Sequence, residues 1–240
     1  MADPRATGEI ADVPETARMA VRDAATVILW RSGPAGPEVL MGTRGARAAF
    51  MPNKVVFPGG AVDAGDSAVA LAGLPDPTCL ARLAAHPRAG STVTPEALLA
   101  AAIREVWEET GLRLAQVATG AAGPAWDGFS DGGHVPDASA LRFVFRAVTP
   151  PGRPRRFDAR FFLVPASAVA GDPGDLSRTD GELAHLQWIG LDRVRAYDLP
   201  FITEVVLAEI GPQIAAGAPV PDSVPVVEND DPVSRVLRLR

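Results

Sequence analysis

Three glutamates stand close together near the middle of the chain, where residues 104–112 read REVWEETGL. Each residue of an α-helix turns by about 100°, so Glu105, Glu108 and Glu109 share one face of a helix. Their mutual repulsion would be relieved by a hard divalent cation such as Mg²⁺, which prefers carboxylate oxygen. A metal ion there can polarise a phosphate group and activate bound water. The triplet therefore indicates phosphoryl or nucleotidyl chemistry, although a solvated acidic helix face would give the same pattern.

The helix that carries these glutamates is the clearest element of the sequence. Thr94 suits the N-cap, Pro95 suits the first helical position and Gly111 suits the stop after the helix. Between them lies PEALLAAAIREVWEET, which is rich in good helix formers. Three apolar residues fall on the side opposite the glutamates and are expected to face the core: Leu99, Ile103 and Val106.

Short apolar runs on either side of this helix are typical of strands. They are expected near 24–30, 38–43, 112–117, 139–148, 157–164 and 185–189, with a further short strand among the turns of 50–60. One or two short helices are expected within 67–93, and a longer helix near 199–210. Mixed strands with a few helices predict an α+β fold, here an α/β/α sandwich around a mixed sheet.

The length of 240 residues suits one domain with additions. Residues 1–20 are polar without periodicity, and a mobile N-terminus is expected there. The domain is expected over 21–211, followed by a C-terminal tail over 212–240, whose Pro- and Val-rich part 212–233 is expected to be loosely held. The Gly-, Pro- and Asp-rich stretch 120–137 is interpreted as a long loop, and loops of that length are often functional.

The formal net charge is −6, from 23 basic and 29 acidic residues. This balance argues against a general nucleic-acid-binding protein, which needs a basic stripe to displace counterions, but it leaves a nucleotide substrate open. No apolar run approaches the roughly 20 residues of a membrane span, and the polar N-terminus does not resemble a signal peptide. The single cysteine, Cys79, rules out an intramolecular disulfide and suits a reducing compartment. We therefore expect a cytoplasmic protein without nucleic-acid or membrane partners.

The sequence around the glutamates resembles the Nudix box, G-x5-E-x7-R-E-U-x-E-E-x-G-U, where U is a bulky aliphatic residue. Residues 104–112 match its second half at every defined position. The stretch VVFPGGAVDAGD at 55–66 is similar to its first half, with Gly60 as the box glycine and Asp66 where the family usually has glutamate. With both halves present, the motif predicts a Nudix-type fold with a helical insertion inside the box.

The two halves of the box lie 30 residues further apart than in the family pattern, which leaves two registers open. In one register Asp66 replaces the box glutamate and the insertion, 67–95, follows it. In the other register Glu96 is the box glutamate. Helical geometry favours Asp66, because Glu96 would lie about 180° from Glu105 and an acid at the helix start is explained by the helix dipole.

The motif R-x5-FMP-x4-FPGG, from Arg44 to Gly60, and the enlarged box resemble a Nudix subgroup that includes the peroxisomal coenzyme A diphosphatases. The resemblance implies metal-dependent hydrolysis of the pyrophosphate bond in a nucleoside diphosphate linked to another moiety, with coenzyme A or acyl-coenzyme A as the leading substrate. Hydrolysis of ADP-ribose, dinucleotides or nucleoside triphosphates is one alternative, and a Nudix-fold binding module without catalysis is another. The expected partner is a small-molecule nucleotide, and a homodimer is left open.

The resemblance also assigns roles within the box and just beyond it. Glu105, Glu108 and Glu109 would ligate Mg²⁺ or Mn²⁺, directly or through water. Arg104 would orient a box carboxylate through a charge-assisted pair. The general base would be a box glutamate such as Glu105 or a carboxylate of a later loop, for which Glu182 in the weaker motif GEL…W is the candidate.

Substrate contacts are expected around the first half of the box. Arg44, Arg47 and Lys54 would receive the substrate phosphates, and Gly59 and Gly60 would let the backbone turn tightly beside the metal. Substrate choice is expected to lie outside the box, in three places: the insertion 67–93, the loop 120–137 and the edge strands.

Overall fold

The computed structural model describes residues 20–46, 50–118, 124, 126–178, 181–229 and 234–240. The expected mobile N-terminus therefore lies outside the described residues, apart from Ala20, and so does Arg47. None of the helices in the described part of the chain has both the length and the apolar character that a membrane span requires.

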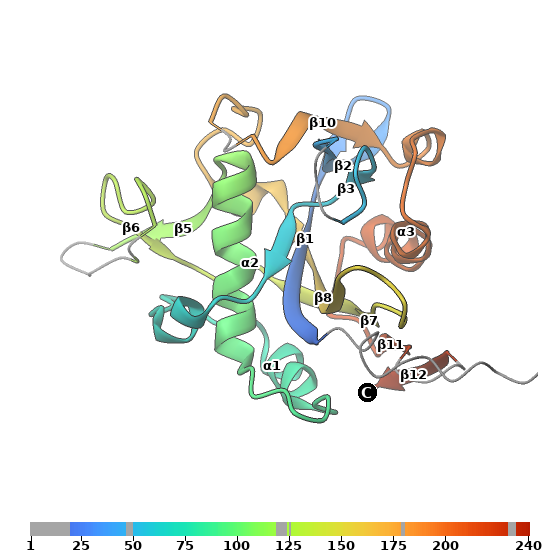
Figure 1. Cartoon of the computed structure of the whole chain (residues 1–240). Helices are drawn as coiled ribbons and strands as arrows, with labels where there is room; N and C mark the ends of the chain where they lie inside the picture. The colour runs from blue at the N-terminus through green and yellow to red at the C-terminus, as the bar shows by residue number, and fades with distance from the viewer. Residues whose placement is uncertain (1–19, 47–49, 119–123, 125, 179–180, 230–233) are drawn as a thin grey trace, which may run out of the picture.

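A mixed sheet forms the centre of the molecule (Figure 1). Its strands are β1 (Val21–Gly33), β2 (Gly36–Arg44), β3 (Val55–Val56), β4 (Gly59–Ala61), β7 (Arg142–Val148), β8 (Arg156–Pro165), β10 (Leu183–Gly190), β11 (Val224–Glu228) and β12 (Arg235–Leu239). They follow in the order β10-β2-β1-β8-β7-β11-β12, with β3 paired to β2 and β4 paired to β1. The pairs β1–β8 and β7–β11 are parallel and the others are antiparallel.

Three helices and a smaller sheet complete the regular structure of the described residues. The helices are α1 (Pro77–Ala84), α2 (Pro95–Thr110) and α3 (Phe201–Ala215). The smaller sheet contains β5 (Arg113–Val117), β6 (His134–Pro136) and β9 (Val169–Ala170), in the order β6-β5-β9. The predicted strands are therefore present within a few residues of their expected bounds, and the predicted loop 120–137 contains the short strand β6.

Helices α2 and α3 cover opposite faces of the main sheet (Figure 1). Successive side chains of a strand face opposite ways, and β1 serves both layers. Val27 and Leu29 belong to the apolar cluster under α2, whereas Ile28 belongs to the cluster under α3, and all three are fully buried. Burial on both faces explains why residues 27–30 of β1 form a continuous apolar run. The predicted α+β sandwich with a mixed sheet is confirmed.

Helix α2 begins and ends where its sequence predicts. The hydroxyl of Thr94 accepts a hydrogen bond from the Ala97 amide at 3.2 Å, and Pro95 opens the helix. Gly111 ends it with a φ of 72°, a left-handed conformation that glycine adopts at little cost. The predicted core face is fully buried: Leu99, Ile103 and Val106.

The expectation of a loosely held C-terminal tail is wrong for much of 212–228. Helix α3 continues through Pro212 to Ala215, where Ile214 is buried. Strand β11 then runs parallel to β7 inside the main sheet. Its Val224 and Val226 are fully buried. The Pro- and Val-rich composition concealed a strand whose burial depends on β7, about 80 residues earlier in the chain.

The insertion packs against this C-terminal segment. Its helix α1 lies near the N-terminal end of α2 (Figure 1). The buried guanidinium of Arg82 donates to the carbonyl oxygens of Pro221 and Asp222, the latter at 2.7 Å. His86 Nε2 lies 2.6 Å from the carboxylate of Glu228. The insertion therefore holds β11 in place from outside the sheet.

We expect Arg82→Ala to lower the free energy of unfolding by about 1–3 kcal/mol, because the charged guanidinium makes two hydrogen bonds to backbone carbonyl groups that alanine cannot make. Urea denaturation measures the loss, and Arg155→Ala, at an exposed position, is the matched control. An equal effect of the two substitutions would show that Arg82 does not hold the C-terminal segment.

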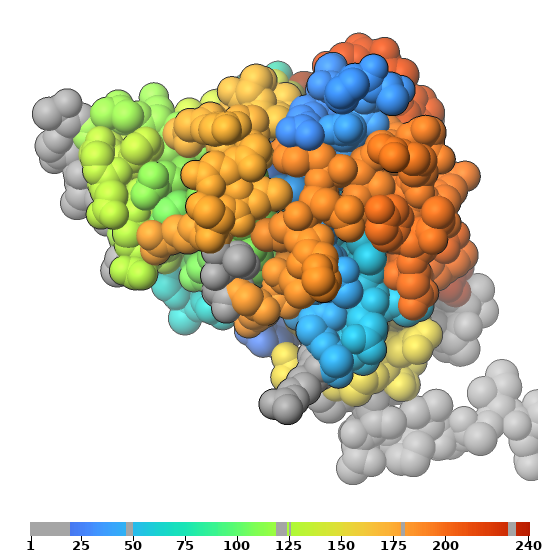
Figure 2. All heavy atoms as spheres, turned by 90° about the horizontal axis from the view of Figure 1, so that it is seen from above, coloured from blue at the N-terminus to red at the C-terminus, as the bar shows by residue number. Residues whose placement is uncertain are grey.

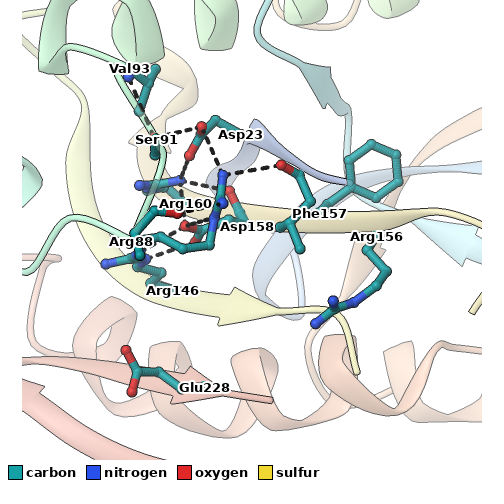
Figure 3. Close-up of polar contacts among 12 residues, drawn as sticks. Asp23, Arg88, Ser91, Val93, Arg146, Arg156, Phe157, Asp158, Arg160 and Glu228 are labelled. Atoms are coloured by element: carbon teal, nitrogen blue, oxygen red, sulfur yellow. Dashed lines mark hydrogen bonds and ion pairs between the residues drawn. The ribbon is translucent and has the colours of Figure 1, made fainter. Parts of the chain in front are cut away.

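A buried ionic cluster ties the end of the insertion to the sheet (Figure 3). Asp158 of β8 is fully buried and accepts two hydrogen bonds from Arg146 of β7, each at 2.7 Å. Arg160 Nη1 lies 2.6 Å from Asp23 of β1 and 3.2 Å from Asp158. Arg88, which belongs to the insertion, reaches both aspartates at 3.4 and 3.5 Å. The insertion is thus fixed to the strands by charge as well as by packing.

Candidate active site

Arg104 on α2 is the centre of the predicted box. Its Nε and Nη2 donate to the two carboxylate oxygens of Asp66 at 2.9 and 3.0 Å. Its Nη1 donates to Glu105 at 2.8 Å and to Glu108 at 2.9 Å. Asp66 is buried, whereas Glu96 is exposed in the first turn of α2. The structure therefore brings Asp66, and not Glu96, to the second half of the box.

A local turn orients Asp66 towards Arg104. Asp66 lies in the 3₁₀ helix Ala64–Ala68, and its Oδ2 accepts a hydrogen bond from the Asp63 amide at 2.8 Å. Burial by itself lowers the pKa of Arg104, but the hydrogen bonds to Asp66 and the charges of Glu105 and Glu108 raise it beyond its ordinary value. The guanidinium is therefore a permanent cation that fixes the direction of these carboxylates.

Glycines allow β4 to approach the acids of α2. The amide of Gly59 donates to Glu109 Oε2 at 2.8 Å, and Glu109 is only 2% exposed. A Cβ atom on Gly60 would lie 2.4 Å from the carboxylate of Glu105, and one on Gly59 would lie 2.5 Å from the carbonyl oxygen of Ala25. Cβ atoms in proteins essentially never lie that close to another heavy atom. The two predicted glycines thus place backbone where any side chain would collide.

Burial shifts the titration of two of the glutamates. Desolvation raises the pKa of Glu105 to about 7, against the opposing effect of Arg104. Desolvation also raises the pKa of Glu109 well above its ordinary value, and the charges of Glu105 and Glu182 add to this rise. Glu108, by contrast, has a side chain that is 41% exposed. The negative charge of the two buried carboxylates is costly in the absence of a cation.

The metal-free protein is expected to lose stability as the pH rises from about 4.5 to about 7, because of Glu105. Its pKa is higher in the folded protein than its ordinary value of 4.5, so the folded protein keeps a proton that the unfolded chain releases. Stability then falls with rising pH across this window, by about 3 kcal/mol. Urea denaturation at pH 5 and 8 with a chelator measures this, and Glu105→Gln should flatten the profile. An equally steep profile in that variant would contradict the assignment.

The donor set suits a hard cation, although Arg104 supplies the positive charge in this structure. Within the described residues, no three acidic, histidine or cysteine side chains are gathered closely enough to hold a metal ion, and Arg104 Nη1 donates to both Glu105 and Glu108. All three glutamates offer carboxylate oxygen, which Mg²⁺ and Mn²⁺ prefer. Their roles as metal ligands therefore stay a prediction.

Two further predicted residues lie beside the acids. Glu182 immediately precedes β10, whose Leu183 is the register partner of Arg44 at the end of β2. Arg44 Nη2 lies 3.8 Å from the carboxylate of Glu182, whose side chain is 65% exposed. The charges of Arg44 and Glu182 both act on Glu109. A solvent-accessible carboxylate and a guanidinium thus stand at the open side of the buried glutamates.

Lys54 does not join this group. Its backbone carbonyl accepts a hydrogen bond from the Arg44 amide at 2.9 Å. Its ammonium, however, is paired with the carboxylate of Asp198, in the segment that leads into α3. The predicted phosphate contact of Lys54 has no support from this placement, and Arg47 lies outside the described residues.

An aromatic group at the C-terminal end of α2 was not predicted from the sequence. Trp107 occupies an undefined position of the box, and Phe129 packs edge-on against it with ring centroids 5.7 Å apart. Trp126 packs on Phe129 in the same way at 5.0 Å. The signal available in the sequence was the pair of aromatic residues, Trp126 and Phe129, in an otherwise Gly- and Asp-rich loop.

The fold matches that of known Nudix hydrolases. The Nudix hydrolase from Alicyclobacillus acidocaldarius is similar to this chain, with 25% identity and a TM-score of 0.54 over 82% of this chain and 97% of that one. A Nudix hydrolase from Nitrosomonas europaea (12% identity, 85% and 94% covered, TM-score 0.48) and a C. elegans Ap4A hydrolase (14%, 82% and 99%, TM-score 0.46) are more distant. Neither a protein-family model nor a curated protein matches the chain.

The chain therefore has the Nudix fold, an α+β sandwich whose box helix is α2. The likeness to the Alicyclobacillus enzyme supports a relationship to the Nudix hydrolases.

Proposed function

We propose that this protein is a metal-dependent hydrolase of the pyrophosphate bond in a nucleoside diphosphate linked to another moiety. One observation carries the proposal: Glu109 is buried and Glu105 is half-buried against a Gly59–Gly60 turn that leaves no room for a side chain. Carboxylates with such raised pKa values, in a site beside an open face, are typical of functional sites. Glu105, Glu108 and Glu109 would hold Mg²⁺ or Mn²⁺, which when bound polarises phosphate and acidifies water.

Individual residues then have separate roles in the reaction. Arg104, which is hydrogen-bonded to Asp66, orients the carboxylates of Glu105 and Glu108. Glu182, which is exposed beside the acids, would accept the proton of the water that attacks phosphorus. Arg44 would bind a phosphate oxygen of the substrate through its guanidinium. The bond that breaks joins the attacked phosphorus to the bridging oxygen, and the second phosphate leaves.

Coenzyme A or acyl-coenzyme A is the leading substrate. This choice rests on the resemblance of the segment from Arg44 to Gly60 and of the enlarged box to the coenzyme A diphosphatase subgroup. ADP-ribose, dinucleotides and nucleoside triphosphates are the second candidates. The insertion helix α1 lies at the far end of α2 from Glu109 (Figure 1), so loops near the C-terminal end of α2 are better placed to select among substrates.

The test is to incubate the purified protein with Mg²⁺ or Mn²⁺ and a substrate panel, with products identified by mass. The panel contains coenzyme A, acyl-coenzyme A, ADP-ribose, NADH, diadenosine polyphosphates and nucleoside triphosphates. Release of a phosphopantetheine and adenosine 3′,5′-bisphosphate supports the leading substrate. Rapid turnover of ADP-ribose with no cleavage of coenzyme A rejects it. Metal binding without any cleavage favours a binding module over a hydrolase.

We expect Gly60→Ala to reduce turnover by about 10²-fold, because a new Cβ must displace the Glu105 carboxylate and small misplacements in a site are that costly. Gly65→Ala is the matched control, since a Cβ at Gly65 meets nothing within 4 Å. Steady-state kinetics on the best substrate measures both. Equal turnover in the two variants would show that the close approach of β4 to α2 is unimportant for the reaction.

A further inference from the structure

Two arginines lie over the indole ring of Trp107, the aromatic residue between the box glutamates. The guanidinium carbon of Arg113 is 4.4 Å from the ring centroid, and that of Arg178 is 4.5 Å from it. The ring itself is fixed, because Trp107 is 4% exposed and its Nε1 donates to the carbonyl oxygen of Asp127 at 3.0 Å. Cation–π contacts of this kind are stronger where water is excluded.

The two arginines come from different parts of the chain. Arg113 begins β5 and donates to the carbonyl oxygen of Gly128 at 2.7 Å. Arg178 follows β9 and donates to the carbonyl oxygen of Asp127 at 3.0 Å, and it lies 3.3 Å from the Asp127 carboxylate. Both arginines therefore contact the same ring and the same loop. Only Arg178 shortly precedes β10 in the chain.

The backbone carbonyl of Arg178 lies close to Gly111, at the C-terminal end of α2. A Cβ atom on Gly111 would lie 2.3 Å from the carbonyl oxygen of Arg178, which any side chain there would displace. Gly111 comes two residues after Glu109. Arg178 is thus held next to the end of α2 by its backbone carbonyl and by its guanidinium.

Glu182 stands four residues after Arg178, immediately before β10. On its other side Leu183 packs closely on β2, where a Cβ on Gly42 would lie 2.9 Å from the Leu183 Cβ. Seen from above, the orange segment that contains β10 lies between the yellow-green region of β5 and β6 and the blue and cyan region of β2 and β3 (Figure 2). Glu182 therefore stands immediately before the strand that pairs with β2 and four residues after the arginine that contacts Trp107.

We propose that Arg178 is a positioning residue, which by stacking on Trp107 holds the Glu182 carboxylate beside Glu105 and Glu109. The proposal rests on the proposed function, in which Glu182 accepts the proton of the attacking water. Arg178 acts through Glu182 and not on the substrate. Arg113 provides a matched contact to the same ring without a link to Glu182.

Kinetics of single and double variants tests this role. Glu182→Gln should lower kcat by about 10²-fold or more, as loss of a general base does. Arg178→Ala should lower kcat about tenfold with little change in KM, Arg178→Lys should restore most of it, and Arg113→Ala should leave kcat within about twofold. Because Arg178 acts through Glu182, Arg178→Ala should have no further effect on kcat in the Glu182→Gln background. A tenfold effect in that background, or an equal effect of Arg113→Ala, overturns the proposal.

Amide hydrogen exchange gives a second readout that does not depend on activity. Arg178→Ala should accelerate exchange at the start of β10, around Leu183 and Ala184, whereas Arg113→Ala should leave it unchanged. If Arg178→Ala leaves exchange at the start of β10 unchanged, the positioning role is wrong, even if the wild-type protein cleaves nothing. A wild-type protein without turnover rejects the proposed function alone, and a wild-type enzyme insensitive to Arg178→Ala rejects the positioning role alone.

Discussion

Glu109→Gln is expected to reduce metal-dependent turnover by about 10³-fold, the upper end of the loss seen when one stabilising group is removed from a preorganised site. Glutamine has nearly the same shape, and its side-chain oxygen can still accept the hydrogen bond from Gly59. The substitution therefore removes the charge of Glu109 and leaves the backbone turn in place. Steady-state kinetics with Mg²⁺ or Mn²⁺ on the best substrate measures the loss.

The same substitution is expected to raise the melting temperature of the metal-free protein. Burial raises the pKa of Glu109 well above its ordinary value, so its ionised form opposes folding at neutral pH. Glutamine has no charge to desolvate. Addition of Mn²⁺ should stabilise the wild-type protein, since a ligand that binds only the folded state does so, but it should have little effect on the variant.

Glu96→Gln is the control for both measurements, because Glu96 lies on the same helix and is exposed in its first turn. It should leave turnover and the Mn²⁺-induced stabilisation almost unchanged. Unchanged turnover in Glu109→Gln would mean that the buried acids do not carry the reaction. A lower melting temperature of that variant would mean that the charge of Glu109 is already compensated in the metal-free protein.

Asp158→Asn is expected to lower the free energy of unfolding by about 3–5 kcal/mol, the usual cost of removing one partner from a buried ion pair. Asp158 is fully buried and accepts a bidentate contact from Arg146 and an ion pair from Arg160 (Figure 3). Asparagine would turn an NH₂ group towards these donors. Arg88 and Arg160 would then keep only the carboxylate of Asp23 as an anionic partner, and Arg146 would lose its own.

Urea denaturation of Asp158→Asn and of Asp192→Asn separates this effect from the loss of any surface charge, since the Asp192 side chain is 71% exposed. Asp192→Asn should change the free energy of unfolding by less than about 0.5 kcal/mol. Similar values for the two variants would show that the cluster in Figure 3 contributes no more than a surface pair.

Local signals made the box helix predictable. Thr94, Pro95 and Gly111 define the ends of α2 through contacts within a few residues of each other, so the sequence contains all of the information needed. The register of the box was predictable for the same reason, because helical geometry alone placed Glu96 away from Glu105. The structure confirms that Asp66 is the acid that meets Arg104.

Contacts between distant segments were not predictable. The sequence of β11 looks like a loosely held Pro- and Val-rich tail, although the strand pairs with β7. The ion pair of Lys54 with Asp198 also has no signal in the local sequence. The contact of Arg178 with Trp107 spans about 70 residues and has no periodic signal in the sequence. Tertiary packing determines these contacts, and the residue pattern of a single segment does not contain that information.

The most direct test of the account is hydrolysis in water labelled with heavy oxygen, with and without Mg²⁺ or Mn²⁺. We expect cleavage of a pyrophosphate-containing nucleotide only when the metal is present, with one heavy oxygen in one of the two phosphate products. We also expect that Glu109→Gln forms almost no labelled product. Binding of the metal without any labelled product from wild-type protein would contradict the claim that the acids of α2 drive hydrolysis.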